Sequence, residues 1–145
     1  MRVLITGLNG LIGWNLFKQF RLIHDTHGTF RKEHACFESA PCYKIDFSRP
    51  SEIKDFLGAL KPDYLIHSWA MCDLDLCELF PQMAYSVNVI GTRNLLTAAA
   101  ELAGLKKIVF VSTDHVFDGD RGNYSESDTP CRNMSMVELK KWPRT

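Results

Sequence analysis

The sequence has no excess of either charge. Its 145 residues include 17 basic and 17 acidic side chains, so the formal net charge is zero. A balanced chain lacks the basic field that attracts nucleic acid or anionic membranes, so neither is expected as a partner. No apolar run reaches membrane-spanning length, and the N-terminus enters a strand-like segment at once, which leaves no room for a signal peptide.

The sequence also lacks a cysteine framework. Five cysteines, an odd number, stand at positions 36, 42, 72, 77 and 131, and no two of them form a C-x-x-C pair. This pattern argues against a disulfide scaffold and against a zinc site, so we expect no metal. The separation of Cys72 and Cys77 is more typical of two small buried residues than of metal ligands. Together these features predict a cytoplasmic protein.

The rest of the chain is organised around one glycine pattern, Gly7–Gly13. It follows Met1–Thr6, a short apolar and β-branched run that is typical of a buried strand. It leads into residues 14–23, where apolar side chains recur at helical spacing through Ile23. Strand, glycine turn and helix form the context in which such a pattern indicates a dinucleotide site.

Each glycine in this pattern has a physical role. Gly7 permits a sharp turn, Gly10 lets the backbone approach a pyrophosphate, and Gly13 lets the helix lie close to the sheet. The helix N-terminus adds free N–H groups for the phosphates. We therefore predict that the cofactor contacts Gly7, Asn9, Gly10, Leu11, Ile12 and Gly13. The alternative is a turn that merely needs glycine, since the spacing is G-x-x-G-x-x-G rather than G-x-G-x-x-G.

Two cations follow the next predicted strand, His27–Phe30. Arg31 and Lys32 stand about 20 residues past the glycines, where dinucleotide folds contact the adenosine ribose. An acidic residue there would accept hydrogen bonds from NAD, whereas cations pair with a 2′-phosphate. The sequence therefore favours NADP(H) over NAD(H). The alternative is a solvated basic loop.

The middle of the chain alternates between strand-like and helix-like segments. Residues 42–47 predict a strand that ends on Asp46 and Phe47, and Ser48 is expected to cap a helix with Pro50 in its first turn. Residues 63–70 predict a buried strand. The acidic stretch 73–78 is expected to be mostly a solvated loop, with a substrate role as the alternative.

A long helix is expected from Pro81 to about Ala103, with Gly104 as its C-cap. Tyr85 and Asn88 fall on its apolar face, and a buried Asn88 must bond a partner such as the backbone of a neighbouring strand. Residues 107–112 predict a fifth strand. Five alternations indicate an α/β fold with a parallel sheet wound on both faces, whose ligands lie at the carboxyl ends of the strands. The glycine pattern and four further residues lie at such ends: Arg31, Asp46, Ala70 and Thr113.

With these residues in hand, the chain resembles the extended short-chain dehydrogenase/reductases, and most closely their dTDP-4-dehydrorhamnose reductase branch. The glycine pattern, Pro62-Asp63 and the run Val87–Leu95 carry the resemblance. The most specific segment is Val111–Gly119, which is similar to the branch's S-T-D-Y-V-F-D-G with histidine in place of tyrosine. The resemblance covers about residues 1–130, the N-terminal half of the family, and implies a Rossmann-like fold truncated after about the fifth strand.

The resemblance implies NADPH-dependent reduction of a 4-keto-deoxy nucleotide sugar. Thr113 matches the family's Ser or Thr that orients the carbonyl. Besides the glycine pattern, the family's cofactor site corresponds to these residues: Arg31, Lys32, Asp46, Phe47, Ser68, Trp69 and Ala70. Trp69 departs from the pattern, because the family has alanine there, and this puts the nicotinamide side of the pocket in question.

The family's Tyr-x-x-x-Lys pair, which supplies the proton, is absent. It should come about two dozen residues after Thr113, but no tyrosine follows Tyr124. We therefore expect a cofactor-binding unit over residues 1–130 that is an inactive fragment, followed by an unrelated or frame-shifted tail over residues 131–145. Read from the third base of each codon, Met134–Pro143 can encode Glu-Tyr-Gly-Arg-Thr-Lys, with tyrosine and lysine four apart.

Two other functions remain open at this stage. One is a nucleotide-sugar epimerase or dehydratase of the same superfamily, against which the run Val111–Gly119 argues. The other is a non-catalytic regulatory protein, similar to the reductase-like regulatory subunit of methionine adenosyltransferase. A sheet that ends at a fifth strand would also expose an open edge, so self-association is expected.

Overall fold

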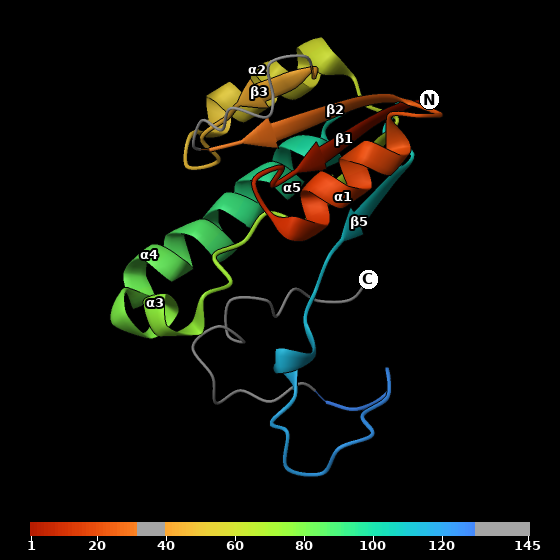
Figure 1. Ribbon diagram of the computed structural model, residues 1–145. Coiled ribbons are helices and arrows are strands. Elements are labelled where there is room, and N and C mark those ends of the chain that lie inside the picture. Colours follow the sequence, from red (N-terminus) through yellow and green to blue (C-terminus); the bar gives the residue numbers. More distant parts are fainter. Residues whose placement is uncertain (32–39, 130–145) are drawn as a thin grey trace.

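The computed structural model describes residues 1–31 and 40–129. Five parallel strands form one sheet in the order β3-β2-β1-β4-β5 (Figure 1). The strands are β1 (Arg2–Thr6), β2 (Asp25–Phe30), β3 (Cys42–Lys44), β4 (Tyr64–His67) and β5 (Lys107–Phe110). The strand order reverses between β1 and β4, the position where open parallel sheets of this kind bind ligands. The predicted fold class, a Rossmann-like doubly wound parallel sheet, is confirmed.

The helices lie on both faces of this sheet. They are α1 (Leu11–Phe20), α2 (Pro50–Leu60), α3 (Leu74–Leu79), α4 (Pro81–Tyr85), the π-helix η2 (Ser86–Gly91), α5 (Thr92–Ala100) and the 3-10 turn η3 (Asp114–Val116). In the part of the chain that the structure describes, no helix is long and apolar enough to cross a membrane.

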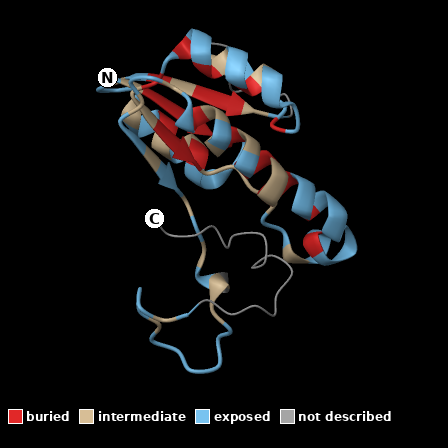
Figure 2. Cartoon of the chain, turned by 180° about the vertical axis from the view of Figure 1, so that it is seen from behind, coloured by how far each residue is buried: buried red, intermediate tan, exposed pale blue. Residues whose placement is uncertain are grey.

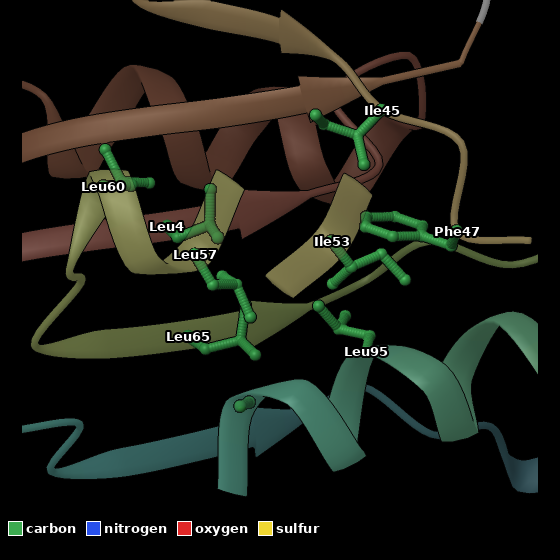
Figure 3. Packing of buried hydrophobic residues seen from close by; sticks show 9 residues of the cluster. Leu4, Ile45, Phe47, Ile53, Leu57, Leu60, Leu65 and Leu95 are labelled. Atoms are coloured by element: carbon green, nitrogen blue, oxygen red, sulfur yellow. The ribbon is translucent and has the colours of Figure 1, made fainter. Parts of the chain in front are cut away.

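Successive side chains of β1 point to opposite faces of the sheet, and each face is covered by its own layer of helices. Val3 and Ile5 point to the face that α1 covers, where they pack with Phe17. Leu4 points to the opposite face, and there it joins side chains of α2 and α5 (Figure 3). Both faces of β1 are therefore buried, as expected for a central strand of a parallel sheet (Figure 2). The central strands and the helices on both faces hold the glycine turn in place.

The helix after the glycine pattern starts earlier than the sequence predicted. Gly10 is the N-cap of α1, so the helix begins at Leu11, inside the glycine pattern. It ends at Phe20, and Ile23 lies beyond it with 76% of its surface exposed. The prediction of residues 14–23 was therefore displaced by about three residues, because a glycine N-cap gives no side-chain signal in the sequence.

The prediction of Ser48 as a helix cap was wrong. The third strand ends at Lys44, and α2 starts one residue later than expected, with Arg49 at the N-cap and Pro50 at the first helical position. The Ser48 N–H group donates to Asp46 Oδ1 at 3.0 Å instead. The turn formed by Asp46 and Ser48 therefore ends before the helix begins.

The acidic stretch is a helix rather than a loop. Asp73 caps α3, because its Oδ1 accepts a hydrogen bond from the Leu76 N–H group at 3.0 Å. This is the ordinary role of aspartate at a helix N-terminus. Asp75 and Glu78 lie on the exposed surface of that helix. The prediction that this stretch is mostly exposed to solvent is confirmed, whereas the prediction that it forms a loop was wrong.

The predicted long helix is divided by the π-helix η2 and ends at Ala100, with Glu101 as its C-cap. Gly104 adopts a positive φ of 95° in the turn that follows. A π-helix has a wider turn than an α-helix, which shifts the buried face. Tyr85 is consequently 51% exposed, whereas Asn88 is buried. The expected apolar face was thus wrong at Tyr85 and right at Asn88.

The edge strand β5 is the least covered strand of the sheet. Val109 is 43% exposed and Phe110 is 36% exposed. Beyond Val111, the chain leaves the sheet and the segment 112–129 extends away from it (Figure 1). Among the described residues, no strand pairs with the outer edge of β5.

Candidate cofactor site

The glycine turn is held by the backbone of two strands. The N–H groups of Gly7 and Leu8 both donate to the Thr29 carbonyl, at 3.1 and 2.9 Å, which ties the turn to the end of β2. Gly7 has a φ of 81°, a conformation that a side chain disfavours. A Cβ atom at Gly7 would also lie 2.8 Å from the Trp69 Cα. The residue at position 7 must therefore be glycine for two independent reasons.

Gly13 and Gly10 differ in what surrounds them. A Cβ atom at Gly13 would lie 2.3 Å from the Gly7 carbonyl oxygen, so Gly13 allows α1 to touch the turn. A Cβ atom at Gly10 would meet only that same oxygen, at 3.3 Å. Gly10 is exposed, so its backbone can be approached from solvent, as close approach of a phosphate requires.

The first turn of α1 suits an anion. Its N-cap, Gly10, has no capping side chain, and no acidic residue lies in its first turn. Leu11 and Ile12 are 82% and 50% exposed, and Asn9 is exposed beside them. The N–H groups at this helix end are thus available to a phosphate, and the helix dipole favours negative charge there.

Asp46 and Phe47 form the next wall of the site, after β3. The hydrogen bond from the Ser48 backbone lowers the pKa of the exposed Asp46 carboxyl, with smaller contributions from nearby arginine charges. Phe47 is buried, and its ring meets the Trp69 ring edge to face at 4.8 Å. The Asn94 side-chain amide donates to the Phe47 carbonyl at 3.0 Å and so ties this wall to α5.

A polar groove opens between β2, β3 and the start of α2. It has a volume of about 350 Å³ and is lined by Arg31, Lys44, Ile45, Asp46, Arg49 and Glu52. Three of these side chains are cationic and two are anionic. Lys32, the other predicted ligand of the 2′-phosphate, lies outside the described residues. Lys44 and Arg49 were not singled out from the sequence, because only the fold brings them beside Arg31.

Ser68, Trp69 and Ala70 follow β4, and Ser68 and Trp69 lie directly against the glycine turn. The Ser68 hydroxyl donates to the Thr6 carbonyl at 2.6 Å. The Trp69 ring is half-buried and lies over Gly91, where a Cβ atom would come within 2.7 Å of it. The bulky side chain that departs from the family pattern is therefore accommodated by a glycine of η2 and by Phe47.

Two buried polar residues position this wall, and the role of one of them was not foreseen. His67 Nδ1 is 2.7 Å from the Thr6 hydroxyl, and its Nε2 is 3.0 Å from the Thr92 hydroxyl. Asn88 accepts from the Met71 N–H group at 2.8 Å and donates to the Met71 carbonyl at 3.0 Å. The backbone partner predicted for Asn88 therefore exists, but it lies after β4 rather than within it. A histidine inside an apolar strand was the available signal for His67.

Thr113 lies beyond the carboxyl end of β5. It is half-buried, and its hydroxyl donates to Asp114 Oδ1 at 3.2 Å. The strand register continues to Val111, whose N–H group donates to the His67 carbonyl at 2.9 Å. Thr113 therefore comes after the carboxyl end of its strand, as the glycine turn, Asp46 and Ala70 do for theirs.

The segment after Thr113 forms its own hydrogen-bonded cluster. Asp128 accepts from the Ser125 backbone and hydroxyl and pairs with Arg121, which lowers the pKa of Asp128 to about 2. The Tyr124 hydroxyl donates to Asp118, and its ring stacks on Phe117 at 4.6 Å. Tyr124 is thus engaged within its own loop. In the part of the chain that the structure describes, no cluster of His, Cys, Asp and Glu side chains could hold a metal ion.

Several known proteins are similar in sequence to this chain. The family model of the RmlD substrate binding domain matches residues 1–134. A probable low-salt glycan biosynthesis reductase, Agl14 of Haloferax volcanii, is 32% identical over 90% of this chain and 43% of its own length. Methionine adenosyltransferase 2 subunit beta of Mus musculus is 30% identical over 89% of this chain and 37% of its own.

Solved structures that are similar to this chain include two dTDP-4-dehydrorhamnose reductases. A hypothetical dTDP-4-dehydrorhamnose reductase from Sulfolobus tokodaii is 32% identical, with a TM-score of 0.85 over 97% of this chain and 49% of that one. The Bacillus anthracis dTDP-4-dehydrorhamnose reductase, solved in complex with NADP, is 29% identical, with a TM-score of 0.78 over 96% and 46%. The chain spans less than half the length of these relatives. It belongs to the RmlD substrate binding domain family of extended short-chain dehydrogenase/reductases, as its motifs predicted.

Proposed function

We propose that this chain binds NADP(H) at the Gly7–Gly13 turn and supplies the cofactor-binding part of a nucleotide-sugar 4-keto reductase. The observation that carries the proposal is the exposed N-terminus of α1, where Gly10 is the N-cap and no side chain caps the helix. The Bacillus anthracis relative solved with NADP supports it. When bound, the cofactor supplies a hydride to a carbonyl carbon.

The residues of this chain would bind and orient that cofactor. The N–H groups at the start of α1 would hold the pyrophosphate, as helix N-termini hold phosphates in general. Arg31 would pair with a 2′-phosphate, and Asp46 and Phe47 would border the adenosine. Ser68, Trp69 and Ala70 would form the wall on the nicotinamide side, and Thr113 would orient the substrate carbonyl by a hydrogen bond.

The preference for NADPH over NADH is tested by removing the charge of Arg31. Arg31→Ala should weaken NADPH binding by about 1.5–3 kcal/mol, the size of a lost charged hydrogen bond, and leave NADH binding nearly unchanged. Isothermal titration of both cofactors measures this. Lys107→Ala, at the opposite end of the sheet, is the control for loss of one positive charge. Equal losses for both cofactors would show that Arg31 does not contact a 2′-phosphate.

We propose that the chain as it stands does not reduce a sugar, because no Tyr-x-x-x-Lys pair follows Thr113. A phenol whose pKa is lowered by a nearby lysine is the family's proton donor. We further propose that this pair is encoded in a shifted reading frame after Pro130. Sequencing the DNA tests this: codons at Ser135 and Leu139 that cannot yield tyrosine and lysine, or an early stop in that frame, would end the hypothesis.

A regulatory role is the second candidate. Subunit beta of methionine adenosyltransferase 2, from several animals, is similar to this chain at 30% identity. A regulatory protein needs the fold and no proton donor. Mixing the chain with a methionine adenosyltransferase catalytic subunit and measuring that enzyme's rate, beside NADPH oxidation with a 4-keto-deoxy nucleotide sugar, separates the two functions.

We also propose that the chain self-associates through β5, a strand at the edge of the sheet that contains the exposed Val109 and Phe110. Light scattering at increasing concentration tests this, and a monomer at all concentrations would refute it. The compartment we propose is the cytoplasm, because Cys42, Cys72 and Cys77 are free thiols.

A further inference from the structure

We propose that Arg49 is a second ligand for the 2′-phosphate and shares it with Arg31 across the groove between β3 and α2. This inference rests on the proposed NADP(H) site. Arg49 belongs to a different element from the basic pair after β2. Only the fold brings it beside the proposed position of the 2′-phosphate.

The place of Arg49 in its helix is the first observation. Arg49 is the N-cap of α2, and its side chain caps no backbone group. Serine, threonine, aspartate and asparagine are preferred at an N-cap, and a positive charge is disfavoured at that end of the helix dipole. Ser48, a suitable capping residue, directly precedes it and is not used. Neither helix capping nor the helix dipole therefore accounts for an arginine at position 49.

The groove is the second observation. Arg31 follows the end of β2, and Lys44 is the last residue of β3, opposite Phe30 in the sheet register. Together with Arg49 they line one cavity of about 350 Å³. Three cations from three elements thus converge where a single ribose phosphate would lie. A phosphate dianion is bound best by cations on more than one side, and arginine offers paired donors that match it.

The two carboxylates in the groove explain how Arg49 is held before a ligand arrives. Arg49 lies 3.9 Å from Asp46 and 3.7 Å from Glu52, both beyond hydrogen-bonding distance, and its side chain is 70% exposed. Asp46 is also engaged by the Ser48 N–H group. A phosphate at hydrogen-bonding distance would therefore compete successfully for the guanidinium group. Glu52, in contrast, would repel that phosphate.

The test uses 2′,5′-ADP and 5′-AMP, which differ only in the 2′-phosphate and need neither nicotinamide nor turnover. The wild-type chain should bind 2′,5′-ADP more tightly than 5′-AMP. Arg49→Gln should weaken 2′,5′-ADP binding about tenfold, the order expected for one charged hydrogen bond, and leave 5′-AMP binding unchanged. Glu52→Gln should act in the opposite direction and strengthen 2′,5′-ADP binding alone. Lys107→Gln should change neither.

The outcomes separate the two proposals. If the wild-type chain binds 2′,5′-ADP preferentially and Arg49→Gln keeps that full preference, the role of Arg49 is overturned and the cofactor site stands. If the wild-type chain binds neither nucleotide, the proposed cofactor site fails, and this inference fails with it. Circular dichroism of each variant shows that it is folded, and Glu52→Gln tests the groove independently of any effect of Arg49 on α2.

Discussion

Replacing Gly13 by alanine should damage this fold, although alanine is the better helix former. Gly13 lies in the first turn of α1 and is buried. The new methyl group would lie 2.3 Å from the Gly7 carbonyl oxygen and 2.8 Å from the Gly7 carbonyl carbon. Both are backbone atoms of a turn that Thr29 holds by two hydrogen bonds, so they cannot move aside without breaking those bonds.

The size of the effect follows from two opposing terms. Helix propensity alone would stabilise the alanine variant by about 0.5–1 kcal/mol. Overpacking a well-packed contact typically costs about 1–3 kcal/mol, and here the obstructing atoms are backbone. We expect a net loss of about 1–2 kcal/mol. Gly58→Ala is the matched control, because nothing lies within 4 Å of a Cβ atom at this glycine of α2. It should gain the propensity term alone.

Urea unfolding followed by circular dichroism measures both variants. With a slope of about 2 kcal/mol per molar, Gly13→Ala should lower the midpoint by roughly 0.5–1 M and Gly58→Ala should raise it by roughly 0.3–0.5 M. The opposite signs are the result that matters. If Gly13→Ala were as stable as the wild type, or if the two variants shifted the midpoint in the same direction, the close contact between α1 and the glycine turn would be refuted.

Three further predictions concern other parts of the chain. Asn88→Ala should lower the free energy of unfolding by about 1–3 kcal/mol, because the Met71 backbone groups lose both partners; an unchanged urea midpoint would contradict this. The pKa of Asp128 is about 2, below its ordinary 3.8, so its stabilisation of its loop should be full above about pH 4 and disappear as the pH falls towards 2; an NMR titration midpoint near 4 would be inconsistent. Burial raises the pKa of Cys42 to about 11, so iodoacetamide at pH 8 should alkylate the exposed Cys72 before Cys42. Peptide mass spectrometry measures the order, and alkylation of Cys42 before Cys72 would contradict the prediction.

The sequence was sufficient where local pattern and tertiary role coincide. The strand Arg2–Thr6 has an unbroken apolar centre, Val3–Ile5, because both of its faces are buried there, and that continuity is visible in the sequence. The glycines of the following turn are needed for local geometry, so their spacing predicted the turn correctly. The parallel, doubly wound architecture followed from the alternation of such segments.

The sequence was insufficient where one element depends on another. The residues of α4, η2 and α5 form a continuous helical pattern, and nothing local indicates that Ser86–Gly91 is a π-helix. This segment contains Gly91, which receives the Trp69 ring, and Asn88, which binds the Met71 backbone, and both contacts come from the chain after β4. The groove that joins Arg31 to Arg49 is likewise a product of strand order. Contacts between distant segments of this kind leave no periodic signal.

We propose above all that the Gly7–Gly13 turn is an NADP(H) site. Titration of the 145-residue chain with NADPH and with NADH, each followed by calorimetry at the same ionic strength, tests it most directly. The account predicts saturable binding of one NADPH per chain, with affinity for NADPH higher than for NADH. Gly10→Glu, which places a carboxylate at the exposed N-terminus of α1, should abolish binding of both. Failure of the wild-type chain to bind either cofactor, or undiminished binding by Gly10→Glu, would contradict the account.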